Sequence, residues 1–111
     1  MMQFDELIAS IDELRREDLD EWLAEALVSS QQADEGPVFS DAQCARVRLI
    51  CTLRYDLDVE TDTLPLVMQL VDELHATRRR LRQLSGAVMT QDEAVQETVV
   101  GLLRQRREDE A

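Results

Sequence analysis

The segment Phe39-Ser-Asp-Ala-Gln-Cys-Ala-Arg-Val-Arg-Leu-Ile-Cys-Thr-Leu-Arg-Tyr-Asp-Leu57 predicts the helix around which the rest of the chain packs. Its apolar residues recur in steps of three and four, the period of a helix with one buried face; they are Ala42, Ala45, Leu49, Ile50, Leu53 and Leu57. The side chain of Ser40 or Asp41 can accept a hydrogen bond from a free N–H group of the first turn, so either residue is expected to cap the helix. By itself this pattern indicates a core helix of a small helical domain.

Two short helices are expected ahead of this segment. Apolar residues at helical spacing predict a first helix from about Gln3 to Ile11 and a second from about Arg16 to Leu27. The second helix would direct its apolar side chains inward, namely Leu19, Trp22, Leu23, Ala26 and Leu27. Its opposite face carries five carboxylates: Glu17, Asp18, Asp20, Glu21 and Glu25. Acidic residues in the first turn also suit the positive end of the helix dipole, which supports the helix assignment.

A small β wing is expected between the second helix and the central one. Residues 28–39 show no helical stripe, and Asp34-Glu-Gly-Pro37 is a turn signal. This turn lies between β-forming residues, Val28 on one side and Val38 with Phe39 on the other. A two-stranded wing fits this pattern, and a plain surface loop is the alternative.

A second long helix is predicted from about Leu64 to Leu84 or beyond, with Asp62 or Thr63 as its cap and Pro65 in its first turn. Its apolar residues follow a 4-3-4-3 rhythm, typical of a helix that pairs with another helix; they are Leu70, Leu74, Thr77, Leu81 and Leu84. The partner helix can belong to a second copy, which predicts a homodimer through Leu74, Leu81 and Leu84. It can also be the C-terminal helix of the same chain.

The last part of the chain is predicted to be a helical extension. Ser85 and Gly86 mark an expected break after Leu84, and Thr90-Gln-Asp-Glu93 matches a capping box, so a final helix is expected from Gln91 to about Arg107. The predicted organisation is a domain over residues 1–88, followed by a C-terminal helical extension over residues 89–111. The predicted class is mainly α with a small β wing, a long closing helix and an extra C-terminal helix.

The charge of the chain is strongly acidic and unevenly distributed. The 111 residues, enough for one domain, include 12 arginines, no lysine and 24 acidic residues, a net charge of −12. Residues 1–41 carry twelve acidic and two basic side chains, whereas residues 65–84 carry two acidic and four basic ones. Because a DNA-binding domain usually has a basic face for phosphates, nucleic acid is not an expected partner. The acidic part is either a solvated surface or one that attracts a basic protein.

The sequence contains no recognisable catalytic or metal-binding constellation. His75 is the single histidine, and the three glycines are isolated, so they form no phosphate-binding loop. Cys44 and Cys51 lie about 10 Å apart along one predicted helix, too far for a disulfide, so both are expected to be reduced and mostly buried. No signal peptide or membrane span is recognised. We therefore expect a cytoplasmic binding module without cofactor or metal, and not an enzyme.

Four sequence segments, in this order along the chain, resemble those of a known family: Leu23-Ala-Glu-Ala-Leu-Val28, the segment from Phe39 to Leu57, Leu64-Pro-Leu-Val-Met-Gln-Leu-Val-Asp-Glu-Leu74 and Arg79-Arg-Leu-Arg-Gln-Leu84. With two short helices and a wing before them, they resemble the MerR-like winged helix-turn-helix group. Within that group the sequence is more similar to the CbpM family of chaperone modulators. The likeness covers about residues 4–84 and leaves out the C-terminal helix.

The resemblance implies a modulator that binds the J-domain of a CbpA-type DnaJ co-chaperone and restrains its activity with DnaK, without catalytic residues. Since a J-domain presents a basic helix to DnaK, the predicted binding residues are carboxylates of the second helix, namely Glu17, Asp18, Glu21 and Glu25. The alternative is a MerR-like DNA-binding transcription regulator, which the arginines of residues 78–82 favour. In MerR regulators the second helix enters the major groove, where these carboxylates would face phosphate with like charge.

Overall fold

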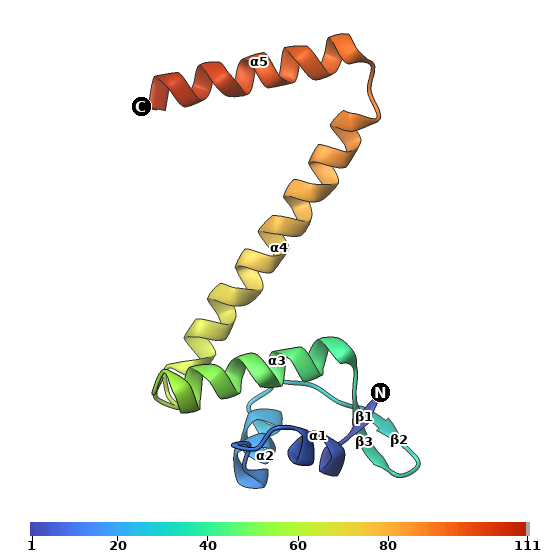
Figure 1. Ribbon diagram of the computed structural model, residues 1–111, viewed down its shortest axis with the longest axis vertical. Helices are drawn as coiled ribbons and strands as arrows, with labels where there is room; N and C mark the ends of the chain where they lie inside the picture. Colours follow the sequence, from blue (N-terminus) through green and yellow to red (C-terminus); the bar gives the residue numbers. More distant parts are fainter. Residues whose placement is uncertain (111) are drawn as a thin grey trace. The chain divides into compact units, whose positions relative to one another are not determined.

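The computed structural model describes residues 1–110 as a mainly helical chain with a small antiparallel sheet (Figure 1). The chain forms two compact units. Unit 1, Met1–Leu70, contains β1 (Met2–Gln3), α1 (Phe4–Ser10), α2 (Arg16–Ala24), β2 (Gln31–Ala33), β3 (Gly36–Phe39), α3 (Asp41–Cys51), the π-helical segment η1 (Thr52–Asp56) and the first turns of α4 (Leu64–Met89). Unit 2, from Val71 onward, contains the rest of α4 and α5 (Glu93–Glu110). The units divide within α4, between Leu70 and Val71, whereas the boundary expected between residues 88 and 89 falls in the last turn of α4.

The predicted hairpin is present and belongs to a three-stranded sheet of order β1-β3-β2. Strands β2 and β3 pair from Gln31 opposite Val38 to Ala33 opposite Gly36, whose φ of 115° suits only glycine at low cost. The first strand of the hairpin therefore begins at Gln31 and not at Val28. Strand β1, which the sequence pattern did not predict, pairs Met2 with Phe39 and makes β3 the central strand.

Helix α3 lies in the core of unit 1, and its buried face overlaps the predicted one only in part. Its cap is Ser40, whose Oγ accepts a hydrogen bond from the N–H of Gln43 at 3.2 Å. The buried side chains of α3 are Cys44, Val47, Ile50 and Cys51, in one cluster with Leu7, Leu19, Trp22, Phe39, Leu64 and Met68. Of the predicted stripe, Ile50 is buried, Leu49 and Leu53 are half-buried and pack against the core, and Ala42, Ala45 and Leu57 are exposed. Both faces of α3 carry apolar residues, and the other elements of unit 1 cover the face that contains the two free cysteines.

Helix α2 ends at Ala24, three residues before the predicted end. Ala26 adopts a left-handed conformation with a φ of 59°, and the N–H of Leu27 donates to the carbonyl of Trp22 at 2.9 Å. This left-handed turn is a common way to end a helix. It redirects the chain so that Leu27 and Val28 enter the core, whereas Ala26, predicted to face inward, is exposed.

Helix α4 continues through Ser85 and Gly86 to Met89, so the break predicted over residues 84–89 comes only at the end of that segment. A glycine inside a helix costs only about 1 kcal/mol relative to alanine, which a helix of 26 residues tolerates. Helix α5 begins at Glu93, because the carboxylate of Asp92 accepts a hydrogen bond from the N–H of Val95 at 3.0 Å. Thr90, the predicted cap, instead donates its hydroxyl to the carbonyl of Ala87 at 2.7 Å.

Candidate functional site

Helix α2 presents its carboxylates on a well-anchored element of unit 1. Its inward side chains Leu19 and Trp22 are almost fully buried. On one flank the hydroxyl of Tyr55, in η1, donates a hydrogen bond to the carboxylate of Asp18, and the rings of Trp22 and Tyr55 lie 6.3 Å apart. Burial and this hydrogen bond raise the pKa of Tyr55 above its ordinary value. Asp18, a predicted partner-binding residue, therefore connects α2 to η1.

The remaining acidic residues of α2 form its outward face, which we call the acidic face and define as Glu17, Asp20, Glu21 and Glu25. Glu17 and Glu21 are one helical turn apart, so their carboxylates are neighbours. All four side chains are exposed, and none forms a hydrogen bond or ion pair with another residue of the described chain. Glu25 lies just beyond the last helical residue, at the C-cap. Three of the four predicted partner-binding residues are thus available to a partner.

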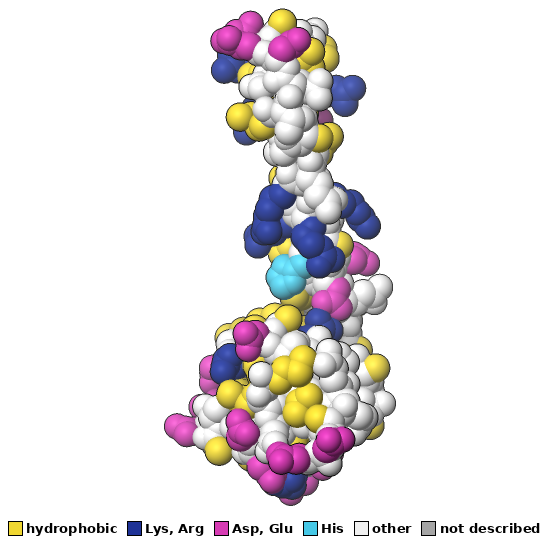
Figure 2. All heavy atoms as spheres, turned by 90° about the vertical axis from the view of Figure 1, so that its right-hand side faces the viewer, with side chains coloured by type: hydrophobic (Ala, Val, Ile, Leu, Met, Phe, Trp, Pro, Cys, Tyr) yellow, Lys and Arg dark blue, Asp and Glu magenta, His cyan; other side chains and the backbone are white. Residues whose placement is uncertain are grey.

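The acidic face belongs to a strongly negative unit. Unit 1 contains sixteen acidic and five basic side chains, a net charge of −11. Figure 2 shows Asp and Glu side chains spread over the visible surface of this unit, whereas arginines gather on α4. Such a field attracts basic partners and repels phosphate groups.

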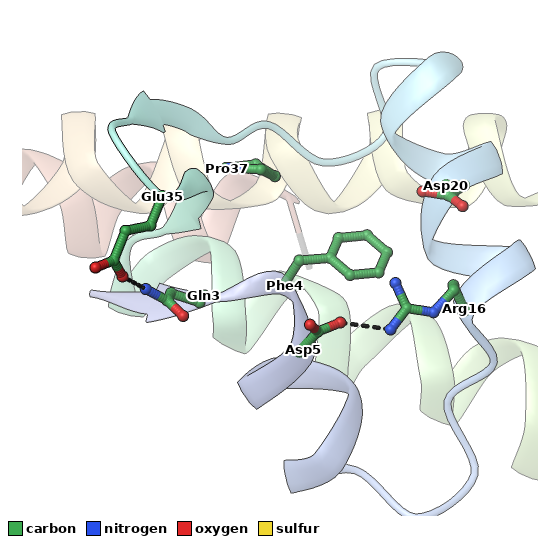
Figure 3. A pocket seen from close by; sticks show the side chains of 7 residues that line it. All are labelled: Gln3, Phe4, Asp5, Arg16, Asp20, Glu35 and Pro37. Atoms are coloured by element: carbon green, nitrogen blue, oxygen red, sulfur yellow. Dashed lines mark hydrogen bonds and ion pairs between the residues drawn. The ribbon is translucent and has the colours of Figure 1, made fainter.

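A shallow hollow of about 340 Å³ lies beside the acidic face (Figure 3). Its lining residues come from β1, α1, α2 and the β2–β3 hairpin: Gln3, Phe4, Asp5, Arg16, Asp20, Glu35 and Pro37. Arg16 forms an ion pair with Asp5, which raises the pKa of the arginine, and its guanidinium lies 4.9 Å from the ring centroid of Phe4. The amide of Gln3 donates a hydrogen bond to Glu35. Sequence reasoning missed this hollow, since no spacing along the chain connects residues from four elements.

The predicted dimer residues lie on a second exposed surface, in unit 2. Leu74, Leu81 and Leu84 of α4 are 49%, 62% and 64% exposed. Four arginines share this part of the helix: Arg78, Arg79, Arg80 and Arg82. All four are exposed and form no ion pair with the described residues. An apolar row beside free cations is suited to contact with another helix or an acidic group.

The described residues form no metal site, and their cysteines and histidine do not form a catalytic group. Over residues 1–110, no cluster of three or more His, Cys, Asp or Glu side chains is arranged to hold a metal ion. Burial, with nearby carboxylates, raises the pKa of the Cys51 thiol to about 11, so this buried thiol stays protonated at neutral pH. His75 is exposed on α4. In the same residues, no helix combines the length and apolar character needed to span a bilayer.

No protein-family model, curated protein or solved structure matches this chain. The features that bear on its function are the two exposed surfaces, namely the acidic face of unit 1 and the exposed leucines of α4, Leu74, Leu81 and Leu84.

Proposed function

We propose that this chain is a MerR-like chaperone modulator of the CbpM type, which binds the J-domain of a CbpA-type DnaJ co-chaperone and restrains its activity with DnaK. The observation that carries the proposal is the acidic face of α2, whose carboxylates are exposed and form no direct ion pair with a residue of the described chain. The J-domain bound by the family that the sequence resembles presents a basic helix. Complementary charge of this kind steers association and selects the partner.

The anchoring of α2 supports this use. Leu19 and Trp22 fix the helix on the core, and the bond between Tyr55 and Asp18 fixes its flank. The outward carboxylates of Glu17 and Glu21 therefore occupy a rigid element, which lowers the entropy lost on binding. The modulator would act by covering the basic helix that the J-domain needs for DnaK, a role that requires no catalytic residue.

Calorimetric titration with the J-domain of the host's CbpA-like co-chaperone, at two salt concentrations, tests the proposal. We expect micromolar or tighter binding that weakens with salt, and a loss of at least ten-fold in the Glu17→Arg/Glu21→Arg variant. The matched control is Glu60→Arg/Asp62→Arg, which changes the net charge of unit 1 equally at exposed positions outside the acidic face. Equal losses in both variants would reject the acidic face as the site, and no binding at low salt would reject the function.

We also propose that the chain forms a homodimer through Leu74, Leu81 and Leu84. The support is the heptad spacing of these leucines together with their exposure in unit 2. Sedimentation at micromolar concentration should give twice the mass of one chain. Leu81→Arg should produce a single-chain mass, whereas Gln83→Arg, on the opposite side of α4, should not. A single-chain mass for the unmodified protein would refute the dimer.

The second candidate function is a MerR-like DNA-binding regulator, favoured by the four unpaired arginines of α4. The charge of unit 1 opposes it, because contacts to phosphate require basic side chains. Fluorescence anisotropy with labelled duplex DNA at low salt decides between the two. Binding that weakens steeply with salt and is lost in Arg79→Ala/Arg80→Ala would favour the DNA-binding function.

A further inference from the structure

Unit 2 contains two apolar rows that are exposed or half-exposed. One is on α4 and consists of Leu81, Leu84 and Val88. The other is on α5 and consists of Val95, Val99 and Leu102. Helix α5 does not pack along α4 in the structure. Six aliphatic side chains in one small unit are thus not covered by another helix. Exposed apolar rows of this kind mark contact surfaces.

The residue spacing of the α4 row, counted backward along the chain, equals that of the α5 row, counted forward, as is required for antiparallel packing of the two helices. Counting back along α4 from Val88, the row continues four, three and four residues away, at Leu84, Leu81 and Thr77. Counting forward along α5 from Val95, the same steps give Val99, Leu102 and Arg106. Antiparallel helices place such rows in register when their steps agree in reverse order. The two helices therefore form four matching layers, three of them aliphatic.

The connection between the helices fixes this same register. The two members of every layer are equidistant from the point between Gln91 and Asp92, inside the three-residue connection Thr90–Asp92. A helical hairpin with a connection of two to five residues has its register set by that connection. A second copy or an unrelated helix could bind in any register. The agreement therefore identifies α5 of the same chain as the occupant of the α4 row.

We propose that α5 is a strap that closes onto α4 of its own chain as an antiparallel hairpin, covering Leu81 and Leu84. The structure describes the strap open. Its corner is held by hydrogen bonds from the amide of Gln96 to the carbonyls of Met89 and Gln91, at 3.2 and 2.9 Å. Closure exchanges these exposed hydrogen bonds for apolar contact. Since the proposed homodimer uses the same leucines, closure regulates dimerisation, and this second part rests on the proposed function.

Charge gives the strap a physical control. Closure brings the arginines of residues 78–82 level with Arg104, Arg106 and Arg107. Like charges at this range repel less as salt shortens the Debye length, which is about 10 Å at 0.1 M. Higher ionic strength, or an acidic ligand bound between the two arginine groups, therefore favours the closed strap.

Disulfide trapping in the full chain tests closure directly. In Leu84→Cys/Val99→Cys the two cysteines occupy one predicted layer, so oxidation should give an internal disulfide at the mass of one chain, at a rate independent of protein concentration. The control is Gln83→Cys/Val99→Cys, whose first cysteine lies on the opposite side of α4. Cys44 and Cys51 are buried and common to both variants. Disulfide-linked dimers that increase with concentration, or no disulfide, would overturn the proposal.

Sedimentation equilibrium tests the competition. Leu102→Arg should disable the strap and tighten dimerisation roughly ten-fold, because both copies must be open and the open fraction enters twice. Gln105→Arg adds the same charge outside the row and should leave dimerisation unchanged. Weaker dimerisation in Leu102→Arg would place α5 in the dimer interface and overturn the competition, as would an unchanged constant. If every variant sediments as one chain, the homodimer proposal fails, whereas disulfide trapping still decides whether the strap closes.

Discussion

Removing the hydroxyl of Tyr55 tests the hydrogen bonding between η1 and α2, in which the bond to the Asp18 carboxylate is the main contact. The Tyr55→Phe variant keeps the ring beside Trp22 and loses the bond to Asp18, together with the longer bond of 3.5 Å that the hydroxyl accepts from the N–H of Arg15. A hydrogen bond to a charged group contributes about 1.5–3 kcal/mol. Both partners are half-buried, so we expect a loss near the lower end of this range, about 1–2 kcal/mol in the free energy of unfolding. For a domain of this size the melting temperature should fall by roughly 5–10 °C.

Urea unfolding followed by circular dichroism at pH 7 measures this loss. A double-mutant cycle with Asp18→Asn isolates the coupling between the two side chains, which should be about 1 kcal/mol. Effects that simply add would show that the hydroxyl does not stabilise α2 through Asp18, and would refute the argument. The affinity of the folded variant for the J-domain should fall only slightly, because Leu19 and Trp22 still hold α2 on the core and Glu17 and Glu21 are untouched.

The same hydroxyl gives the variant a pH signature. The pKa of Tyr55 is raised in the folded state, so the folded chain retains this proton at a pH where the unfolded chain, with a pKa of about 10, releases it. The stabilisation is therefore complete below about pH 10 and is lost as the pH rises above that value. Tyr55→Phe should unfold with a weaker dependence on alkaline pH than the unmodified protein. An identical alkaline profile would contradict the assignment of the raised pKa to Tyr55.

Three further changes test other parts of unit 1. Cys51→Ala should flatten the loss of stability between pH 9 and 11, because the folded thiol, with a pKa of about 11, keeps a proton that the unfolded thiol gives up at about pH 9; thermal melts across this range measure it. Ala26→Gly should raise the free energy of unfolding by about 0.5–1 kcal/mol, since glycine adopts the left-handed conformation without strain, whereas Ala24→Gly inside α2 should lower it. Ser40→Ala should cost about 1 kcal/mol in urea unfolding by removing the cap of α3, and Asp41→Ala much less.

The local features of this fold could be predicted from the sequence, because each depends on neighbouring residues. Ser40 followed by a helical stripe marks the start of α3, and Asp34-Glu-Gly-Pro37 marks the hairpin. The end of α2 could not be predicted, since an alanine in the left-handed conformation is set by the burial of Leu27 and Val28. Strand β1 depends on pairing Met2 with Phe39, which two residues of sequence do not signal.

The choice of buried face on α3 shows a second kind of limit. Leu49 and Leu53 on one side and Val47 with the cysteines on the other give two apolar faces of similar quality. The positions of Phe39, Trp22 and the other core residues decide that Val47 and the cysteines are fully buried, whereas Leu49 and Leu53 are only half-buried against the core. The acidic face was easier to predict from the sequence, because carboxylates at helical spacing face the solvent whichever residues lie beneath them. Asp18 is the exception, since its partner Tyr55 lies 37 residues away in a π-helical segment.

The uneven charge of the chain connects the two proposals and keeps them separable. Binding of a basic J-domain helix to the acidic face pairs opposite charges, so its affinity falls as salt increases. Closure of the strap brings like charges together, so it is favoured by the same change. Low salt therefore gives an open chain with exposed leucines and an attractive acidic face, whereas high salt weakens the acidic face and covers the leucines. Because the two effects arise in different units and involve different residues, Glu17→Arg/Glu21→Arg alters only the first and Leu102→Arg only the second. If both depended only on the net charge of the chain, each variant would instead change J-domain affinity and strap closure together.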